Sequence, residues 1–334
     1  MTQGIRVLIA DDSPTMRETI SAICAADPLI SIVGHARDGL EAVQLARTLR
    51  PDVITMDVRM PKLDGLSAVR AIMADAPTRI IVVCSPIGAV DDDLPFQAIQ
   101  AGALELLAKP RGLERADFDR KLIEAIRLMA AVPVVGRRHS RANEARPPRV
   151  DAIGLVASTG GPPALATILG GLPRELAAPV LVAQHMAPGF SSGLVRWLSA
   201  VTPLPIVQVE GPVVPLVGHV YMPRDEHHLE IDRDGVLQVR RSTGGHTPSG
   251  NRLLHSLAEA YGDKAAGVVL TGMGEDGAAG LLSIKRRGGL TIAQDEPSSI
   301  VFGMPRAAMT IGAVRDTTPL SRIADLLREA ANES

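Results

Sequence analysis

The chain has 334 residues, of which 46% are hydrophobic and 22% are charged, and its formal net charge is −2. At roughly 100 to 200 residues per domain, this length predicts two domains whose cores are large enough to fold without disulfides or a structural metal. The near-neutral charge gives no electrostatic reason to bind nucleic acid, no apolar run approaches the ~20 residues that span a bilayer, and the start lacks a signal-peptide pattern. Because the two cysteines also share no redox or metal spacing, we expect a cytoplasmic protein without membrane insertion.

The first 130 residues alternate short aliphatic runs with stretches whose apolar residues recur at helical spacing. The runs that predict strands are residues 6–10, 31–35, 52–56, 79–84 and 104–108. Aromatic residues make up only 2% of the chain, so the buried strands must be aliphatic, which is typical of parallel sheets. These β–α repeats predict an α/β domain over residues 1–130 with a doubly wound, flavodoxin-like sheet of five strands.

Polar side chains follow four of these strands at their carboxyl ends, where open α/β sheets bind ligands. They are Asp11, Asp12, Asp57, Ser85 and Lys109. Three converging carboxylates would repel one another without a hard cation, which favours Mg²⁺. The lysine and the hydroxyl can hold a phosphoryl group, and Asp57 can act as a nucleophile that forms an aspartyl-phosphate. The alternative, that these acids only cap the following helices, explains Asp12 but not the whole set.

The same residues resemble the response-regulator receiver domain over about residues 4–128, through DD after the first strand, MDVRMPKLDG around the acceptor and AKP after the fifth strand. The resemblance implies that Asp57 is phosphorylated, that Mg²⁺ is held by Asp11, Asp12 and Asp57, and that Ser85 and Lys109 contact the phosphoryl group. Two positions depart from the family pattern. Arg59 stands where a smaller or acidic residue is usual, and Leu106 replaces the usual aromatic switch residue. We therefore expect phosphate binding and leave the way it is signalled open.

Residues 131–149 separate the two halves and contain five arginines, three prolines and one glutamate. Because its prolines and charges prevent it from forming a hydrophobic core, this segment is predicted to be an Arg/Pro-rich linker. An arginine-rich binding arm is the alternative, although the charges of a flexible linker are usually only solvated.

Residues 150–334 repeat the α/β style and predict a second doubly wound, mostly parallel domain. Its expected strands are residues 152–157, 179–185, 205–209, 266–272 and 290–294. Within residues 219–240 an Asp-Gly turn joins β-rich runs, which predicts an antiparallel hairpin on this sheet.

Three residues of the second half follow predicted strands and together suggest acyl transfer. Ser158 begins the turn Ser-Thr-Gly-Gly before a helix, much like a nucleophile elbow, although alone it also fits a phosphate-binding turn or a helix cap. His185 can take the serine proton, and Asp276 can orient the imidazole. A structural histidine and a capped glycine-rich loop explain these two residues separately, whereas a Ser-His-Asp triad explains all three.

The second half also carries a set of longer motifs, namely GLVASTGGPPAL, LVAQHMAPGFSSG, HTPSGNRLL, VVLTGMGEDGAAGL and TIAQDEPSSIVFGMPRAA. Over about residues 150–330 these resemble the chemotaxis protein-glutamate methylesterases, the CheB family, and the receiver-then-esterase order extends the resemblance to the whole chain. The resemblance implies that Ser158, His185 and Asp276 form the catalytic triad. It also implies active-site positions for Thr159 and Met273, to which we assign backbone contacts with the oxyanion.

This resemblance implies a phosphorylation-regulated hydrolysis of glutamyl methyl esters on methyl-accepting chemoreceptors, with deamidation of receptor glutamines as a related activity. The implied partners are a chemotaxis histidine kinase, as phosphodonor, and the cytoplasmic domains of the receptors, as substrate. Mg²⁺ serves the receiver only, and the esterase needs no cofactor. A phosphorylation-controlled binding module with a weak or inactive esterase domain, in a pathway other than chemotaxis, is the alternative. The departures at Arg59 and Leu106 favour that alternative, and the intact triad counts against it.

Overall fold

The computed structural model describes residues 4–85, 94–110, 115–131, 148–314 and 317–332. The chain divides into two compact units, Met1–Pro133 and Val134–Ser334, and each unit is described by itself. The predicted linker over residues 131–149 lies almost wholly outside the described residues. None of the described helices is both long and apolar enough to cross a membrane.

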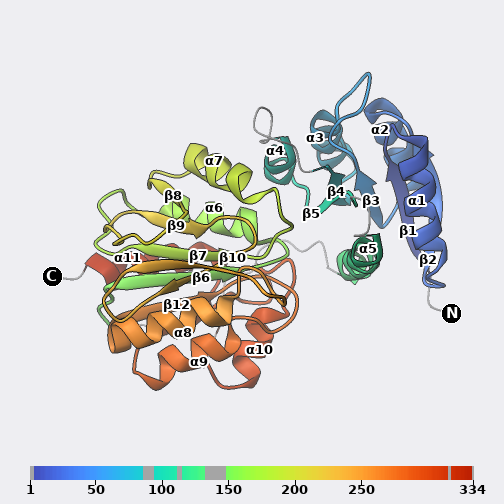
Figure 1. Cartoon of the computed structure of the whole chain (residues 1–334). Coiled ribbons are helices and arrows are strands. Elements are labelled where there is room, and N and C mark those ends of the chain that lie inside the picture. Colours follow the sequence, from blue (N-terminus) through green and yellow to red (C-terminus); the bar gives the residue numbers. More distant parts are fainter. Residues whose placement is uncertain (1–3, 86–93, 111–114, 132–147, 315–316, 333–334) are drawn as a thin grey trace. The chain divides into compact units, whose positions relative to one another are not determined.

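The first unit is a five-stranded parallel sheet with alternating helices, as predicted (Figure 1). The strands are β1 (Ile5–Ala10), β2 (Ile30–Ala36), β3 (Val53–Met56), β4 (Arg79–Cys84) and β5 (Glu105–Ala108). The helices are α1 (Pro14–Ala25), α2 (Gly39–Leu49), α3 (Gly65–Asp75), α4 (Leu94–Gln100) and α5 (Arg115–Ala131). The strand order is β2-β1-β3-β4-β5, so β1 and β3 are neighbours and their carboxyl ends meet at one edge.

Polar side chains begin three helices of this unit. Ser13, Asp38 and Asp64 precede α1, α2 and α3, and each accepts a hydrogen bond from a backbone N–H in the first turn. β1 and β3 are buried along their last four residues. The chain therefore leaves the sheet at fixed points, with Asp11 directly after β1 and Asp57 directly after β3.

The second unit is built on a six-stranded parallel sheet of order β13-β12-β6-β7-β9-β8. Its strands are β6 (Ala152–Ala157), β7 (Val180–Gln184), β8 (Ile206–Val209), β9 (Val220–Pro223), β12 (Ala265–Val269) and β13 (Leu290–Ala293). Its helices are α6 (Gly161–Gly171), α7 (Ser191–Val201), α8 (Gly250–Tyr261), α9 (Ala278–Arg286), α10 (Met304–Thr310) and α11 (Leu320–Asn332), with a 3₁₀ turn, η2, at Gly262–Lys264.

The predicted antiparallel hairpin is confirmed, but it is shorter than residues 219–240 and forms a sheet of its own. It consists of β10 (His227–Ile231) and β11 (Leu237–Arg241). The first part of the predicted hairpin is instead β9, which pairs in parallel with β7 and β8. All four residues of β9 are buried, and such a short run without alternation does not reveal from sequence which strands it joins.

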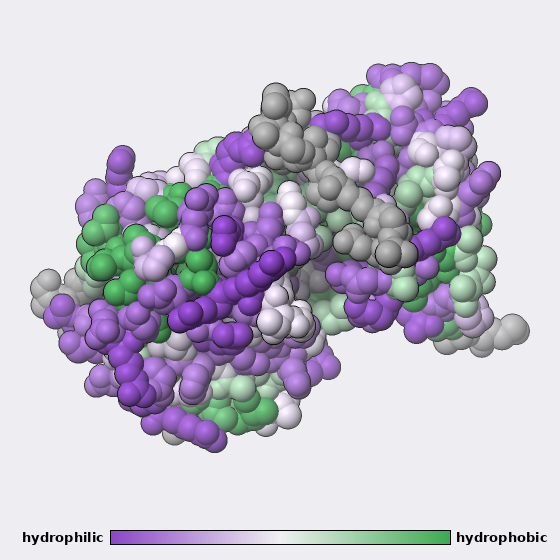
Figure 2. Space-filling model, in the orientation of Figure 1, coloured by the Kyte–Doolittle hydropathy of each residue, from purple (hydrophilic) through white to green (hydrophobic). Residues whose placement is uncertain are grey.

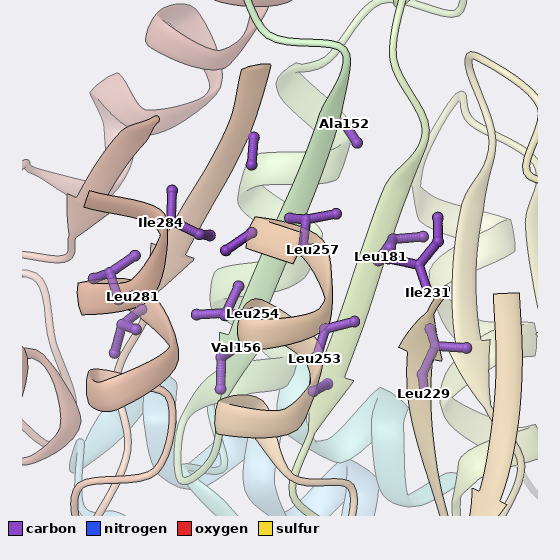
Figure 3. Close-up of a cluster of buried hydrophobic side chains, with 14 of the residues drawn as sticks. Ala152, Val156, Leu181, Leu229, Ile231, Leu253, Leu254, Leu257, Leu281 and Ile284 are labelled. Carbon is purple, nitrogen blue, oxygen red and sulfur yellow. The ribbon is translucent and has the colours of Figure 1, made fainter. Parts of the chain in front are cut away.

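One core cluster of the second unit lies on the side of the sheet covered by α8 and α9 (Figure 3). Leu253, Leu254 and Leu257 of α8 are fully buried and lie in one cluster with Leu229 and Ile231 of β10. The hairpin is therefore fixed to the same helix that packs on the main sheet, and the start of α8 has little freedom to move.

The surface of both units is mostly hydrophilic in the view of Figure 2, with hydrophobic side chains gathered in places on the second unit. Among the large hydrophobic side chains that are exposed, three belong to the segment between β8 and β9, namely Val214, Leu216 and Val217.

Candidate functional site

The first unit brings together four of the predicted polar residues. Asp11, Asp12 and Asp57 each offer a carboxylate oxygen, and these oxygens all lie within 4.8 Å of one another. Asp11 and Asp57 are buried, whereas Asp12 is exposed. The Nζ of Lys109, which follows β5, lies 2.6 Å from Oδ2 of Asp57 and 2.8 Å from Oδ2 of Asp11.

The charges of this cluster do not balance. Burial raises the pKa of Asp57, although the ammonium of Lys109 acts in the opposite direction. Burial disfavours the charged form of Lys109, but its hydrogen bonds to Asp11 and Asp57 outweigh this and raise the pKa of the lysine. Among the described residues, Lys109 pairs with Asp11 and Asp57 but not with Asp12, so the three carboxylates carry more negative charge than this lysine balances. A set of oxygen ligands with excess negative charge fits a hard divalent cation such as Mg²⁺.

The remaining receiver positions lie around this pocket. Ser85 directly follows β4 and is exposed, and Leu106 is half-buried on β5 opposite Val82 of β4. The backbone N–H of Arg59 donates to Oδ1 of Asp57 over 3.3 Å, and its side chain is exposed. Among the residues that the structure describes, that side chain makes no ion pair with Asp11 or Asp12. Among these residues Arg59 therefore contacts Asp57 through its backbone N–H only.

The second unit brings Ser158, His185 and Asp276 to one edge of its sheet. Ser158 follows β6, His185 follows β7, and Asp276 lies in the loop after β12. Because β6 lies between β7 and β12, the three strand ends are neighbours. The side-chain amide of the buried Gln184 donates from Nε2 to the carbonyl oxygens of Ser158 and His185, each over 2.8 Å.

The imidazole and the carboxylate are in direct contact. Nε2 of His185 lies 2.8 Å from Oδ2 of Asp276. Burial would raise the pKa of Asp276, but hydrogen bonds from His185 and from the backbone N–H groups of Asn251 and Gly250 outweigh it and lower this pKa to about 2. In the described part of the chain, no hydrogen bond joins Ser158 to His185, and Nδ1 of His185 is the ring nitrogen without a partner.

The start of α8 holds Asp276 and was not recognised as part of the site from the sequence. The backbone N–H of Gly250 donates to Oδ2 of Asp276, and that of Asn251 donates to Oδ1 over 2.9 Å. The hydroxyl of Ser249, the N-cap of α8, donates to Oδ1 over 3.2 Å. A helix N-terminus stabilises an anion in this way. The motif HTPSGNRLL contained the signal, because a Ser-Gly pair before an apolar periodic run marks a helix start.

The predicted neighbours Thr159 and Met273 lie in turns beside Ser158. A Cβ on Gly272 would lie 2.6 Å from the Cβ of Ser158, so the glycine lets the loop with Met273 approach the serine closely. Within the described ranges, the backbone N–H groups of Thr159 and Met273 have no protein acceptor. The Oγ1 of Thr271 donates to the carbonyl oxygen of Thr159 over 3.0 Å and thereby ties the two turns together.

A second histidine, which sequence reasoning also missed, lies on the first. The rings of His246 and His185 are stacked, with centroids 4.9 Å apart. His246 is exposed, and a Cβ on Gly274 would lie 3.9 Å from its ring. The ring therefore lies beside the glycine-rich loop that carries Met273.

Residues 153–327 match the CheB methylesterase family, and residues 7–117 match the response regulator receiver domain. A Myxococcus xanthus protein named protein-glutamate methylesterase/protein-glutamine glutaminase 3 is 51% identical over 332 residues, covering 98% of this chain and 94% of that protein. The chain belongs to the CheB methylesterase family. A relative from Nitrosospira multiformis with the same name apart from the number is 40% identical over 348 residues, covering 98% of both chains.

A solved member of the CheB methylesterase family supports this assignment. The crystal structure of the Thermotoga maritima CheB methylesterase catalytic domain is 32% identical, with a TM-score of 0.52, and covers 54% of this chain and 98% of that domain. Ser158, His185 and Asp276 lie within the residues that match the CheB methylesterase family. Asp57 and Lys109 lie within the match to the receiver domain. The predicted family and the predicted fold of both halves are confirmed.

Proposed function

We propose that this protein hydrolyses glutamyl methyl esters on methyl-accepting chemoreceptors and that phosphorylation of its receiver regulates the reaction. The observation that carries the proposal is the 2.8 Å contact between His185 and the buried Asp276 at the strand end beside Ser158. The names of the relatives, protein-glutamate methylesterase/protein-glutamine glutaminase, support the substrate class. Because the receptor segments that carry these glutamates are cytoplasmic, we place the enzyme in the cytoplasm.

The first half-reaction transfers the glutamyl acyl group to the enzyme. Oγ of Ser158 attacks the γ-carbonyl carbon of the ester, and Nδ1 of His185 takes the hydroxyl proton. Asp276 holds Nε2 and stabilises the imidazolium that forms. The N–H groups of Thr159 and Met273, which lack acceptors among the residues that the structure describes, donate to the oxyanion of the tetrahedral intermediate. The carbon–oxygen bond to the methoxy group then breaks, and His185 returns the proton so that methanol leaves.

The second half-reaction regenerates the serine. Water attacks the acyl carbon while His185 takes its proton, and the bond to Oγ of Ser158 breaks as the proton returns to the serine. The product is the receptor glutamate. The same acyl chemistry converts a glutamine to a glutamate with ammonia as the leaving group in place of methanol, and we propose this as a second activity of the same site.

The receiver carries the regulatory chemistry in this proposal. A histidine kinase donates its phosphoryl group to Oδ of Asp57, and the phosphoryl oxygens are held by Lys109 and the hydroxyl of Ser85. Asp11, Asp12 and Asp57 would hold Mg²⁺, which supplies positive charge to the transferring group. The support is the cluster of three carboxylate oxygens within 4.8 Å of one another, two of whose carboxylates pair with the ammonium of Lys109.

A methanol-release assay on receptor carrying labelled methyl esters tests the proposal. We expect release by the wild-type protein, stimulation by a small phosphodonor with Mg²⁺, and loss of that stimulation in Asp57→Ala. Ser158→Ala serves as the control for contaminating esterases and releases no methanol. A wild-type protein that binds receptor but releases neither methanol nor ammonia would favour the binding module over the enzyme.

A further inference from the structure

A buried histidine outside the catalytic set makes one well-defined hydrogen bond. His228 lies on β10, and only 3% of its surface is exposed. Its Nδ1 accepts the backbone N–H of Ser249 over a distance of 3.0 Å. Because Nδ1 accepts, the ring in this contact is neutral and carries its hydrogen on Nε2.

The residue that His228 holds belongs to the segment that fixes the carboxylate of Asp276. Ser249 is the N-cap of α8, and its hydroxyl and the next two backbone N–H groups donate to Asp276. The hairpin contacts the same helix a second time, since the N–H of Ile231 donates to Oγ of Ser256 over 3.1 Å. His228 is therefore linked to Asp276 through Ser249, which makes one hydrogen bond to each of them.

We propose that neutral His228 is a positioning residue for Asp276, acting through Ser249 and the start of α8. The proposal rests on the function proposed above, in which Asp276 orients His185. Protonation of His228 places an N–H on Nδ1, which then faces the N–H of Ser249. Two donors cannot bond each other, so the start of α8 loses its anchor and the carboxylate loses its fixed position.

The surroundings of His228 keep it neutral near pH 7. Burial is the main cause that lowers the pKa of His228, and the charges of Arg252 and His227 lower it further. The carboxylates of Glu230 and Asp276 raise the pKa but do not outweigh these effects. An unfolded histidine titrates near ~6.5, above the folded value. As the pH falls below ~6.5 the unfolded chain binds a proton that the folded protein resists, so this group lowers the stability of the fold progressively there.

Two substitutions distinguish the loss of the hydrogen-bond acceptor from the loss of the ring itself. In His228→Asn the amide oxygen stands where Nδ1 stands and can accept the N–H of Ser249 without titrating, whereas His228→Leu offers no acceptor. At pH 7.5 we expect kcat within about threefold of wild type for the Asn variant and at least tenfold lower for the Leu variant, with similar KM. Below pH 6 the kcat of wild type should fall more steeply than that of His228→Asn. The exposed His255 of α8 provides the control His255→Asn, with wild-type values.

A Leu variant with wild-type kcat, or an Asn variant as impaired as the Leu variant, would overturn the proposal. NMR of the wild-type protein provides a second test. In the full chain labelled with ¹⁵N-histidine, the ¹⁵N shifts of His228 at pH 7.5 should be those of the neutral ring with hydrogen on Nε2; a hydrogen on Nδ1 contradicts the anchor. This spectrum decides the role of His228 in the fold even when no methanol release is found, so failure of the proposed function remains distinguishable.

Discussion

The imidazole of His246 lies flat on that of His185, with 4.9 Å between centroids and 10° between ring planes. The stack covers one face of the ring that contacts Asp276, so it limits the rotation of His185 and the approach of water. An aromatic pair contributes about 0.5–1.5 kcal/mol beyond burial. We expect His246→Ala to lower kcat by about two- to tenfold and His246→Phe to retain it, as measured by methanol release. Equal loss in both variants would show that the imidazole chemistry of His246, and not its stacking, is what matters.

The three strand-end residues should behave as a unit. Ser158→Ala should remove nearly all activity, and Asp276→Asn should lower kcat by about 10³ to 10⁴ because the orientation of His185 is lost. Combining the two substitutions should add little to the loss from Ser158→Ala alone. Unchanged circular dichroism serves as the check that the fold persists, and wild-type turnover in Ser158→Ala would falsify the assigned nucleophile.

The carboxylate of Asp276 should also contribute to stability at mildly acidic pH. Its folded pKa of about 2 lies below the unfolded value of about 3.9, so its contribution is present above pH ~4 and is lost as the pH falls towards 2. At about 1.4 kcal/mol per pKa unit, the contribution is on the order of 2 kcal/mol. Denaturant unfolding between pH 5 and pH 3 should therefore show a steeper loss of stability in wild type than in Asp276→Asn. Parallel curves for the two proteins would contradict the lowered pKa.

The start of α8 requires a residue without a side chain. A Cβ on Gly250 would lie 2.1 Å from Cγ1 of the buried Val156, so Gly250→Ala must push the helix away from β6. Overpacking of this kind costs about 1–3 kcal/mol. The variant should therefore unfold at lower denaturant concentration and lose activity, because Gly250 also donates to Asp276. The control is Gly211→Ala, since a Cβ there meets nothing within 4 Å; a wild-type midpoint in Gly250→Ala would mean that the helix start adapts freely.

Arg59 should influence the Mg²⁺ site through its charge alone. Its side chain is exposed and makes no ion pair with the carboxylates of the pocket in the part of the chain that is described, so no contact has to break when a cation binds. Arg59→Glu should tighten Mg²⁺ binding by about two- to tenfold at low salt, less at high salt because exposed charges are screened. Titration of the metal by calorimetry measures this. Identical affinities at low salt would show that Arg59 does not act on the pocket.

Much of the architecture could be predicted from the sequence because the strands are aliphatic and end in polar residues. The runs before Asp11, Asp57, Ser158 and His185 are buried strands in the structure, and each polar residue follows directly. Parallel strands place such residues at one edge, so the residues around Asp57 and those around Ser158 could be predicted to lie together from their positions at strand ends.

The contacts that hold Asp276 in place beside Ser158 and His185 could not be predicted in the same way. Asp276 is held by Ser249, Gly250 and Asn251, which lie about 25 residues earlier on another helix. Such contacts depend on how α8 packs against the sheet, and no local pattern encodes that packing. His246 and His228 were not recognised for the same reason, since the stack and the anchor exist only after the chain has folded. The assignment of β9 was wrong because pairing between short buried runs depends on the fold as a whole.

The side-chain amide of Gln184 joins the turn that carries Ser158 to the turn that carries His185. Its two hydrogen bonds reach the carbonyl oxygens of Ser158 and His185, and a Cβ on Gly161 would lie only 1.9 Å from its Oε1, so the amide is enclosed as well as bonded. A force that displaces one turn is passed to the other through this side chain. The spacing between Ser158 and His185 is therefore maintained when a large protein substrate presses on this edge, whereas Asp276, in the loop after β12, is held separately by the start of α8.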